Sequence, residues 1–288
     1  MKYAIIANPF SGSKSRDEKE RFLAEASSIL DAPVYGLETK SASQLVRIAR
    51  KKSHIYDVLV VAGGDGTFSD VMNALDLSKT VLAFIPLGTG NALAYALNYH
   101  GSLADICFRI KRGDIHCHDL IDCNSLRKSF MASVGIEGKI LKMFDKFSQL
   151  GEPGIVSYFA ASVNAFFKDF TSTRAIISVD GRTFTERRLL SFMVLKQPYY
   201  GFGMKMIPNA SPYDHRLHVR CMSKDIAQVA LASIASFTIG NRFGRYLTGK
   251  QVRIELEDPL ILQTDGNMGW ESREFTFKVC SEVLKIKY

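Results

Sequence analysis

Glycine-rich turns follow three apolar runs near the start of the chain. The apolar run 58–62 leads directly into Gly63-Gly64-Asp65-Gly66-Thr67. The run 81–85 is followed by Pro86-Leu87-Gly88-Thr89-Gly90-Asn91, and the run 3–7 by Asn8-Pro9-Phe10-Ser11-Gly12. Backbone N–H groups at such turns can bind phosphate oxygens, because glycine lets the backbone approach a ligand closely. The three turns together indicate a nucleotide-phosphate site.

The spacing of these turns disfavours two common nucleotide-binding classes. None fits the G-x-G-x-x-G pattern of dinucleotide dehydrogenases or the G-x-x-x-x-G-K-[ST] pattern of Walker-type NTPases. One such turn alone is equally an ordinary loop. Ligands of open parallel sheets bind beyond the carboxyl ends of the strands, where all three turns are expected. Their number and place therefore favour a binding site.

The two halves of the chain differ in their patterns. Residues 1–115 alternate apolar runs with helical patterns at 17–30, 42–51, 68–75 and 91–97, which predicts an α/β domain with a parallel sheet. Residues 116–288 predict a mainly antiparallel β domain with helices inserted within 136–170. Its expected strands are 130–134, 189–195, 217–221, 252–256, 260–263, 275–279 and 283–286. Asp180-Gly181 between two alternating runs predicts a type I′ hairpin.

The composition indicates which kinds of partner and which cellular compartment suit the protein. The 288 residues carry a formal net charge of +8, which suits a nucleotide, an anionic membrane surface or nucleic acid. Five cysteines without C-x-x-C spacing suit free thiols in a reducing cytoplasm. The first apolar run is too short for a signal peptide, and residues 226–240 are too short to span a bilayer. We therefore expect a cytoplasmic protein that is soluble or peripherally attached to a membrane.

The sequence resembles the diacylglycerol kinase catalytic domain family, which includes bacterial lipid kinases and sphingosine and ceramide kinases. The resemblance rests on the three turns and continues through Tyr200-Gly201-Phe202-Gly203-Met204-Lys205, Pro208-Asn209-Ala210, Asp214 before Leu217, and Asp265-Gly266. It implies ATP and Mg²⁺ as cofactors and a lipid as acceptor. It also implies a lipid-substrate domain at 116–288, an active site in the interdomain cleft, and a last strand that can return to the first domain.

The resemblance also implies which residues bind the cofactors. The expected nucleotide contacts are Asn8, Pro9, Ser11, Gly12, Thr39, Gly63, Gly64, Asp65, Gly66, Thr67, Gly88, Thr89 and Asn91. Thr39 is included because the family carries a threonine at the end of its second strand. The implied magnesium ligands are the carboxylate of Asp214 and the backbone carbonyls of Ser211 and Arg216. His215 replaces the usual glycine here, so this turn cannot rely on a conformation reserved for glycine.

The implied catalytic residues are Asp65, Asp265 and Asn267. The family's Asp-Gly-Glu motif, whose glutamate resembles a general base, reads Asp265-Gly266-Asn267 here. Asparagine cannot accept a proton at neutral pH. Either Asp265 or Asp65 takes this role, or Glu271 does, or catalysis is lost. Asp65 has the structural alternative of capping the helix that follows it.

Two segments bear on the lipid and the membrane. Residues 155–167 are apolar around most of a helix, which suits a buried core helix or the wall of an acyl-chain pocket. Lys139, Lys142 and Lys146 fall on one helical face beside Phe144 and Phe147, which suits an anionic membrane surface or a solvated face.

These observations predict an ATP-dependent lipid kinase that phosphorylates a hydroxyl of diacylglycerol, a sphingoid base or ceramide. Asn267 motivates an alternative, a catalytically weak regulator that binds nucleotide or lipid. A NAD kinase shares residues 63–67 but does not account for the first turn or for residues 200–210. We expect no nucleic-acid partner, and the sequence does not indicate an oligomeric state.

Overall fold

The computed structural model describes residues 1–150, 154–169 and 172–288, which form two compact units. Unit 1 comprises Met1–His118 and Glu282–Tyr288, and unit 2 comprises Asp119–Ser281. The last residues belong to unit 1 because the end of β13 (Asn267–Lys287) pairs in parallel with β4 (Val81–Pro86). Unit 1 is therefore discontinuous in sequence.

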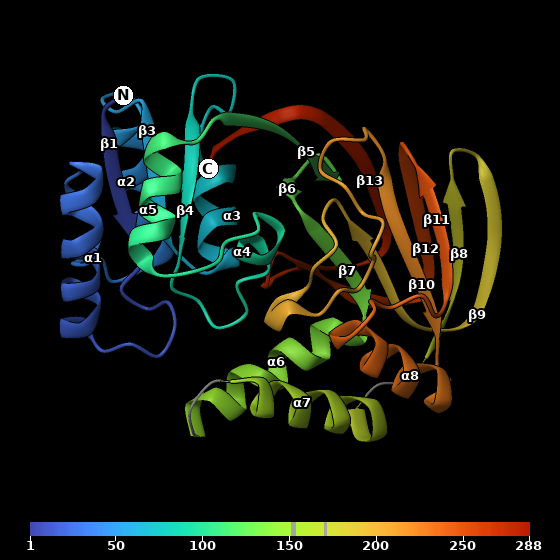
Figure 1. The fold of residues 1–288 in the computed structure, drawn as a ribbon. Coiled ribbons are helices and arrows are strands. Elements are labelled where there is room, and N and C mark those ends of the chain that lie inside the picture. The colour runs from blue at the N-terminus through green and yellow to red at the C-terminus, as the bar shows by residue number, and fades with distance from the viewer. Residues whose placement is uncertain (151–153, 170–171) are drawn as a thin grey trace. The chain divides into compact units, whose positions relative to one another are not determined.

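Unit 1 is built on a parallel sheet. Its order is β2 (Val34–Tyr35), β1 (Tyr3–Ala7), β3 (Val58–Gly63), β4 and the end of β13. The helices along this part of the chain are α1 (Arg16–Leu30), α2 (Ala42–Lys52), α3 (Asp65–Asn73), α4 (Ala92–Ala96) and α5 (Leu103–Arg112). The predicted α/β domain is confirmed (Figure 1). The helix α5 was not predicted.

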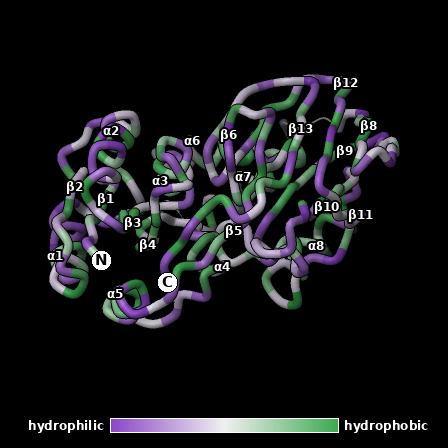
Figure 2. The backbone as a smooth tube through the Cα atoms, turned by 90° about the horizontal axis from the view of Figure 1, so that it is seen from above, coloured by the Kyte–Doolittle hydropathy of each residue, from purple (hydrophilic) through white to green (hydrophobic). Residues whose placement is uncertain are grey.

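Alternate side chains of the unit 1 strands pack against opposite helix layers. Ile5 on β1 belongs to a buried cluster with Leu23 of α1 and Cys107 of α5. On the other face, the ring of Phe84 meets that of Phe68 of α3 edge-on, with centroids 5.5 Å apart. Both faces of the sheet are thus covered, which explains why β3 and β4 are hydrophobic along their length (Figure 2).

The helices of unit 1 begin in two different ways. Ser15, Ser41 and Ser102 cap α1, α2 and α5 with their side chains. The N-cap residues of α3 and α4 are Gly64 and Asn91, and neither makes a side-chain cap hydrogen bond. The helix predicted at 68–75 is α3, and its predicted start is wrong. The helix already begins at Asp65, within the glycine-rich turn.

Unit 2 contains mainly antiparallel strands. They are β5 (Ile115–Cys123, beginning in unit 1), β6 (Arg127–Ser129), β7 (Met131–Gly135), β8 (Thr173–Val179), β9 (Arg182–Leu195), β10 (Leu217–Ser223), β11 (Arg245–Gly249), β12 (Gln251–Thr264) and most of β13. They pair in the order β11-β10-β9-β7-β12-β13, and β8 pairs with both β9 and β12. The predicted antiparallel domain is confirmed. So is the hairpin at Asp180 and Gly181, whose φ angles of 47° and 82° are both positive.

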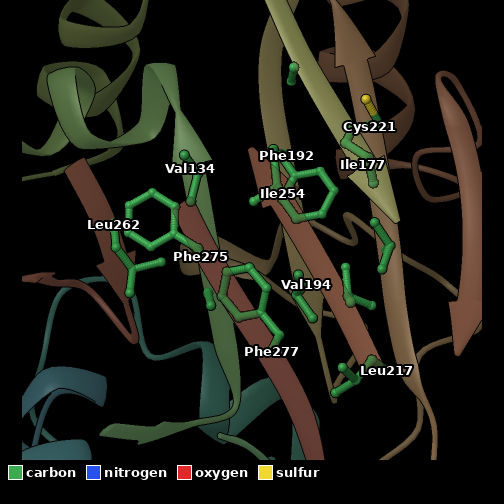
Figure 3. Close-up of a cluster of buried hydrophobic side chains, with 14 of the residues drawn as sticks. Val134, Ile177, Phe192, Val194, Leu217, Cys221, Ile254, Leu262, Phe275 and Phe277 are labelled. Atoms are coloured by element: carbon green, nitrogen blue, oxygen red, sulfur yellow. The ribbon is translucent and has the colours of Figure 1, made fainter. Parts of the chain in front are cut away.

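Aromatic and aliphatic side chains fill the core of unit 2 (Figure 3). Phe192 and Phe277 lie with ring centroids 6.2 Å apart within a cluster that includes Val134 and Leu262. The helical elements of this unit are α6 (Ile136–Leu150), α7 (Ile155–Asn164), α8 (Ile226–Phe237), a π turn at Ala165–Asp169 and a 3-10 turn at Gly201–Gly203. None of the helices within the described residues has the length and apolar character that crossing a bilayer requires.

Candidate functional site

The three glycine-rich turns of unit 1 are joined by side-chain hydrogen bonds. The amide of Asn8 donates to Oγ1 of Thr67 at 2.7 Å. The hydroxyl of Ser11 lies 3.2 Å from the same Thr67 oxygen, and it accepts a hydrogen bond of 3.3 Å from the backbone N–H of Gly64. The first and second turns thus form one structure.

Glycine allows the third turn to touch the other two. A Cβ atom at Gly88 would lie 2.5 Å from the Cα of Gly64, and one at Gly12 would lie 2.0 Å from the carbonyl oxygen of Leu87. The backbone N–H groups of Leu87 and Gly88 donate to the carbonyl of Gly63 at 2.8 and 3.2 Å. No larger residue fits these contacts without displacement of the backbone.

The carboxylate of Asp65 caps α4. Its oxygens accept hydrogen bonds from the backbone N–H groups of Ala92 and Leu93, both at 2.9 Å. Asp65 therefore satisfies the start of a helix 27 residues further on. Desolvation raises the pKa of Asp65, and the hydrogen bonds from α4 oppose this.

The other predicted nucleotide contacts occupy different environments. Asn91 adopts φ 46° and its amide donates to the carbonyl of Gly88 at 2.7 Å, while Gly66 lies in the first turn of α3. Thr89 is exposed in the third turn. Thr39 is buried and its hydroxyl donates to Gly36 at 2.6 Å, within its own turn. Thr39 therefore belongs to a separate hydrogen-bonded turn.

One residue at the first turn was missed by the sequence analysis. Lys19 of α1 is 4% exposed, and its ammonium donates to the carbonyl of Pro9 at 2.5 Å. Burial lowers the pKa of Lys19. A lysine in a helical pattern is normally interpreted as an exposed, solvated charge, so the sequence around Lys19 does not indicate that it is buried.

The predicted catalytic residues of unit 2 lie at the hairpin between β12 and β13. Asp265 is 1% exposed, and its Oδ1 accepts the backbone N–H groups of Phe130 and Met131, both at 3.0 Å. Asn267 is the first residue of β13 and is half-buried, and Glu271 is exposed on the same strand. Asp265 therefore anchors the segment that leads into β7.

The predicted magnesium ligands already have a cation. The ammonium of Lys196 lies 2.8 Å from Oδ1 of Asp214 and 2.6 Å from the carbonyl oxygen of Arg216. The side-chain hydroxyl of Ser211 accepts a hydrogen bond from the backbone N–H of Tyr213 at 3.2 Å. Within the residues that the structure describes, no group of three His, Cys, Asp or Glu side chains is arranged to hold a metal ion. This turn therefore does not fit Mg²⁺.

An apolar cavity of about 140 Å³ lies in unit 2 under α6, α7 and α8, with Ile140, Tyr158, Leu190 and Val229 among its walls. A second cavity of about 390 Å³ shares Phe166 and Val229 with it. Glu137 also lines the first cavity, is 4% exposed, and accepts a short hydrogen bond from Ser191 through Oε1.

The polar end of this cavity was not predicted. Among the residues that the structure describes, none forms a hydrogen bond with Oε2 of Glu137. Desolvation raises the pKa of Glu137 to about 7, although the bond from Ser191 acts in the opposite direction.

The predicted lysine face falls on α6. Lys139 and Lys142 are both exposed on this helix. The side chains of Lys146 and Phe147 lie outside the described residues, so the structure leaves this predicted face incomplete.

Comparison with known proteins covers both units. Residues 2–123 match the family described as Diacylglycerol kinase catalytic domain, and residues 131–286 match the YegS C-terminal NAD kinase beta sandwich-like domain. The chain is similar to a diacylglycerol kinase of Bacillus subtilis (strain 168), with 24% identity over 92% of this chain and 89% of that protein.

Two solved structures have a similar fold. A crystal structure of a diacylglycerol kinase from Bacillus anthracis str. Sterne matches with a TM-score of 0.73 and 19% identity, over 100% of this chain and 96% of the other. An NAD kinase from Archaeoglobus fulgidus, solved in complex with ATP, matches with a TM-score of 0.54 and 13% identity, over 100% and 94% of the two chains.

Proposed function

Because the chain belongs to the diacylglycerol kinase catalytic domain family, we propose that it is an ATP-dependent lipid kinase. It transfers the γ-phosphoryl group to a hydroxyl of a lipid such as diacylglycerol, a sphingoid base or ceramide. The observation that carries this proposal is the interlocking of three glycine-rich turns around the start of α3.

The turns would hold the nucleotide phosphates. Gly64, the N-cap residue of α3, makes no side-chain cap hydrogen bond, and the helix dipole favours an anion there. Close contact between Gly64 and Gly88 keeps side chains out of this region. Mg²⁺ bound with the nucleotide would offset phosphate charge during transfer. It is assigned no ligand in the turn 211–216, because Lys196 occupies that position.

Asp65 is our candidate for the proton acceptor. It lies among the turns, is half-buried, and has a raised pKa. Each carboxylate oxygen accepts one backbone hydrogen bond from α4, and a carboxylate oxygen can accept two. Asp265 is almost fully buried, so a lipid hydroxyl cannot easily reach it. Glu271 is exposed to solvent, so it offers no partly desolvated site for the proton transfer. Both are therefore poorer candidates than Asp65.

The two apolar cavities, one lined by α6, α7 and α8 and the other by α7, the π turn and α8, would take the acyl chain. Their walls are aliphatic and aromatic, as expected of a site for a hydrocarbon. Glu137 supplies a polar group at this site that can donate or accept a hydrogen bond near neutral pH. We further propose that the protein acts in the cytoplasm and meets its lipid at an anionic membrane surface, in keeping with its net charge of +8.

The proposal is tested by label transfer from [γ-³²P]ATP in mixed micelles that contain diacylglycerol, a sphingoid base or ceramide, with NAD as a soluble acceptor. Label in a lipid product supports the kinase. Label that appears only in NADP would replace it with an NAD kinase. Nucleotide binding without any transfer would favour the regulator that Asn267 suggests.

A further inference from the structure

Lys196 is a fully buried lysine with a complete set of oxygen partners. It directly follows β9, and its side chain is 0% exposed. Its ammonium lies 2.9 Å from Oδ2 of Asp119, 2.8 Å from Oδ1 of Asp214 and 2.6 Å from the carbonyl oxygen of Arg216. An ammonium has three N–H donors, so all three are satisfied.

The two carboxylates around Lys196 are themselves held in place. Asp119 is 0% exposed and accepts the backbone N–H of His215 at 2.7 Å. Oδ2 of Asp214 lies 2.7 Å from Nε2 of His218, whose Nδ1 lies 2.8 Å from the hydroxyl of Tyr246.

A second histidine faces the other carboxylate, with Nδ1 of His215 3.2 Å from Oδ1 of Asp119. The ammonium of Lys196 lies between the two carboxylates, within 2.9 Å of one oxygen of each.

Two of the three oxygens around Lys196, from the Asp214 carboxylate and the Arg216 carbonyl, belong to residues that the family resemblance gives to a metal ion. Mg²⁺ requires about six oxygen ligands at roughly 2.0–2.1 Å in an octahedron. Lys196 contacts both Asp214 and the carbonyl of Arg216, so a metal ion there would have to displace the ammonium or lie beside a like charge.

We propose that the Lys196 ammonium is a built-in cation that replaces a divalent metal ion at the turn 211–216. It fixes Asp119, and Asp119 in turn holds His215 at φ 55°, a left-handed conformation that glycine adopts more easily. Unit 2 then needs no divalent cation for its stability. This inference does not depend on the proposed kinase activity.

Thermal unfolding of the full chain without nucleotide tests this inference. The wild type is expected to have the same Tm in EDTA as with added MgCl2 or CaCl2. Lys196→Ala leaves two carboxylates and a space, so its Tm in EDTA should fall and should then rise with metal concentration. Lys250→Ala, at an exposed lysine, is the matched control and should show neither effect.

Mn²⁺ as a paramagnetic probe provides a second measurement on the wild type, should Lys196→Ala not fold. The NMR signals of the His218 ring should stay sharp when Mn²⁺ is added. Broadening of these signals, together with a higher wild-type Tm in MgCl2, would overturn the inference. So would a Lys196→Ala protein that is as stable as Lys250→Ala in EDTA, or one that folds but responds to no divalent cation.

Discussion

The side-chain amide of Asn8 donates a 2.7 Å hydrogen bond to Oγ1 of Thr67, 59 residues further along the chain. The bond joins the end of β1 to the first turn of α3, where the phosphates are proposed to bind. The first prediction concerns how much this hydrogen bond contributes to the free energy of nucleotide binding. Asn8→Ala and Thr67→Ala should each weaken binding of a non-hydrolysable ATP analogue, and less than additively in the double variant.

The coupling energy from this cycle should be about 0.5–1.5 kcal/mol, as for one neutral hydrogen bond. Isothermal titration calorimetry measures it. Ser53→Ala, at the C-terminal end of α2, serves as the control partner and should be additive with Asn8→Ala. Full additivity of Asn8→Ala and Thr67→Ala would show that the bond does not shape the site.

The second prediction concerns the contact between the second and third turns. Gly88→Ala places a Cβ atom 2.5 Å from the Cα of Gly64 and should cost about 1–3 kcal/mol of stability, as in other overpacked sites. It should also weaken binding of the ATP analogue. Gly154→Ala, whose Cβ meets no atom of the described part of the chain within 4 Å, is the control and should have little effect on affinity. Unchanged nucleotide affinity in Gly88→Ala would remove the third turn from the proposed site.

The third prediction separates two roles of Asp65. Asp65→Asn should lose about 0.5–2 kcal/mol of stability, because one of the two N–H groups of α4 loses its acceptor. Turnover should fall further, by about 10²- to 10⁴-fold, because the proton acceptor is lost. Asp17→Asn, at an exposed aspartate of α1, controls for the loss of one charge.

The pH profile of kcat/KM gives an independent measurement of Asp65. A base acts only when deprotonated, so activity should fall as the pH drops through its pKa. Since desolvation raises this pKa, the acid limb should lie above the ordinary aspartate value of 3.8. Wild-type turnover in Asp65→Asn would leave Asp65 as a helix cap alone.

The fourth prediction follows from the buried carboxyl of Glu137. Its pKa is raised from 4.5 to about 7, so its contribution to stability is fully present below pH 4.5 and is lost as the pH rises through 7. Glu137→Gln should therefore be more stable than the wild type at pH 8, by on the order of 3 kcal/mol. At pH 4 this advantage should vanish. Urea unfolding at the two pH values measures it, and an equal difference at both would contradict the raised pKa.

The fifth prediction takes Asn267 as its subject. If Asp65 accepts the proton, Asn267→Glu should change turnover little. A tenfold or greater rise in turnover would instead indicate that the wild type lacks a base at this position. Asp265→Asn should mainly lower stability, because Asp265 binds the backbone of Phe130 and Met131.

Local patterns predicted much of the architecture. Apolar runs ending in glycine located β1, β3 and β4, and Asp180-Gly181 located a hairpin, because both signals reside in neighbouring residues. The helix α5 was missed even though Ser102 and Asp105 form a capping box at its start. The apolar residues of α8 were considered only as a possible membrane span, so its helix was missed as well.

Non-local partners could not be predicted from the sequence. Asp65 binds the N–H groups of Ala92 and Leu93, which only the folded turns bring close. Lys196 follows β9, Asp119 lies on β5 and Asp214 precedes β10, so only the folded chain brings the three together. Such partners have no fixed spacing, so no periodic pattern or motif reveals them.

Phosphoryl transfer to a lipid is the central claim, and label transfer from [γ-³²P]ATP tests it most directly when wild type and Asp65→Asn are assayed side by side. The products are separated into organic and aqueous phases. The account predicts label in the organic phase for the wild type and about 10²- to 10⁴-fold less for Asp65→Asn. An organic phase without label for every lipid in the panel, from a folded protein that binds ATP, would contradict it.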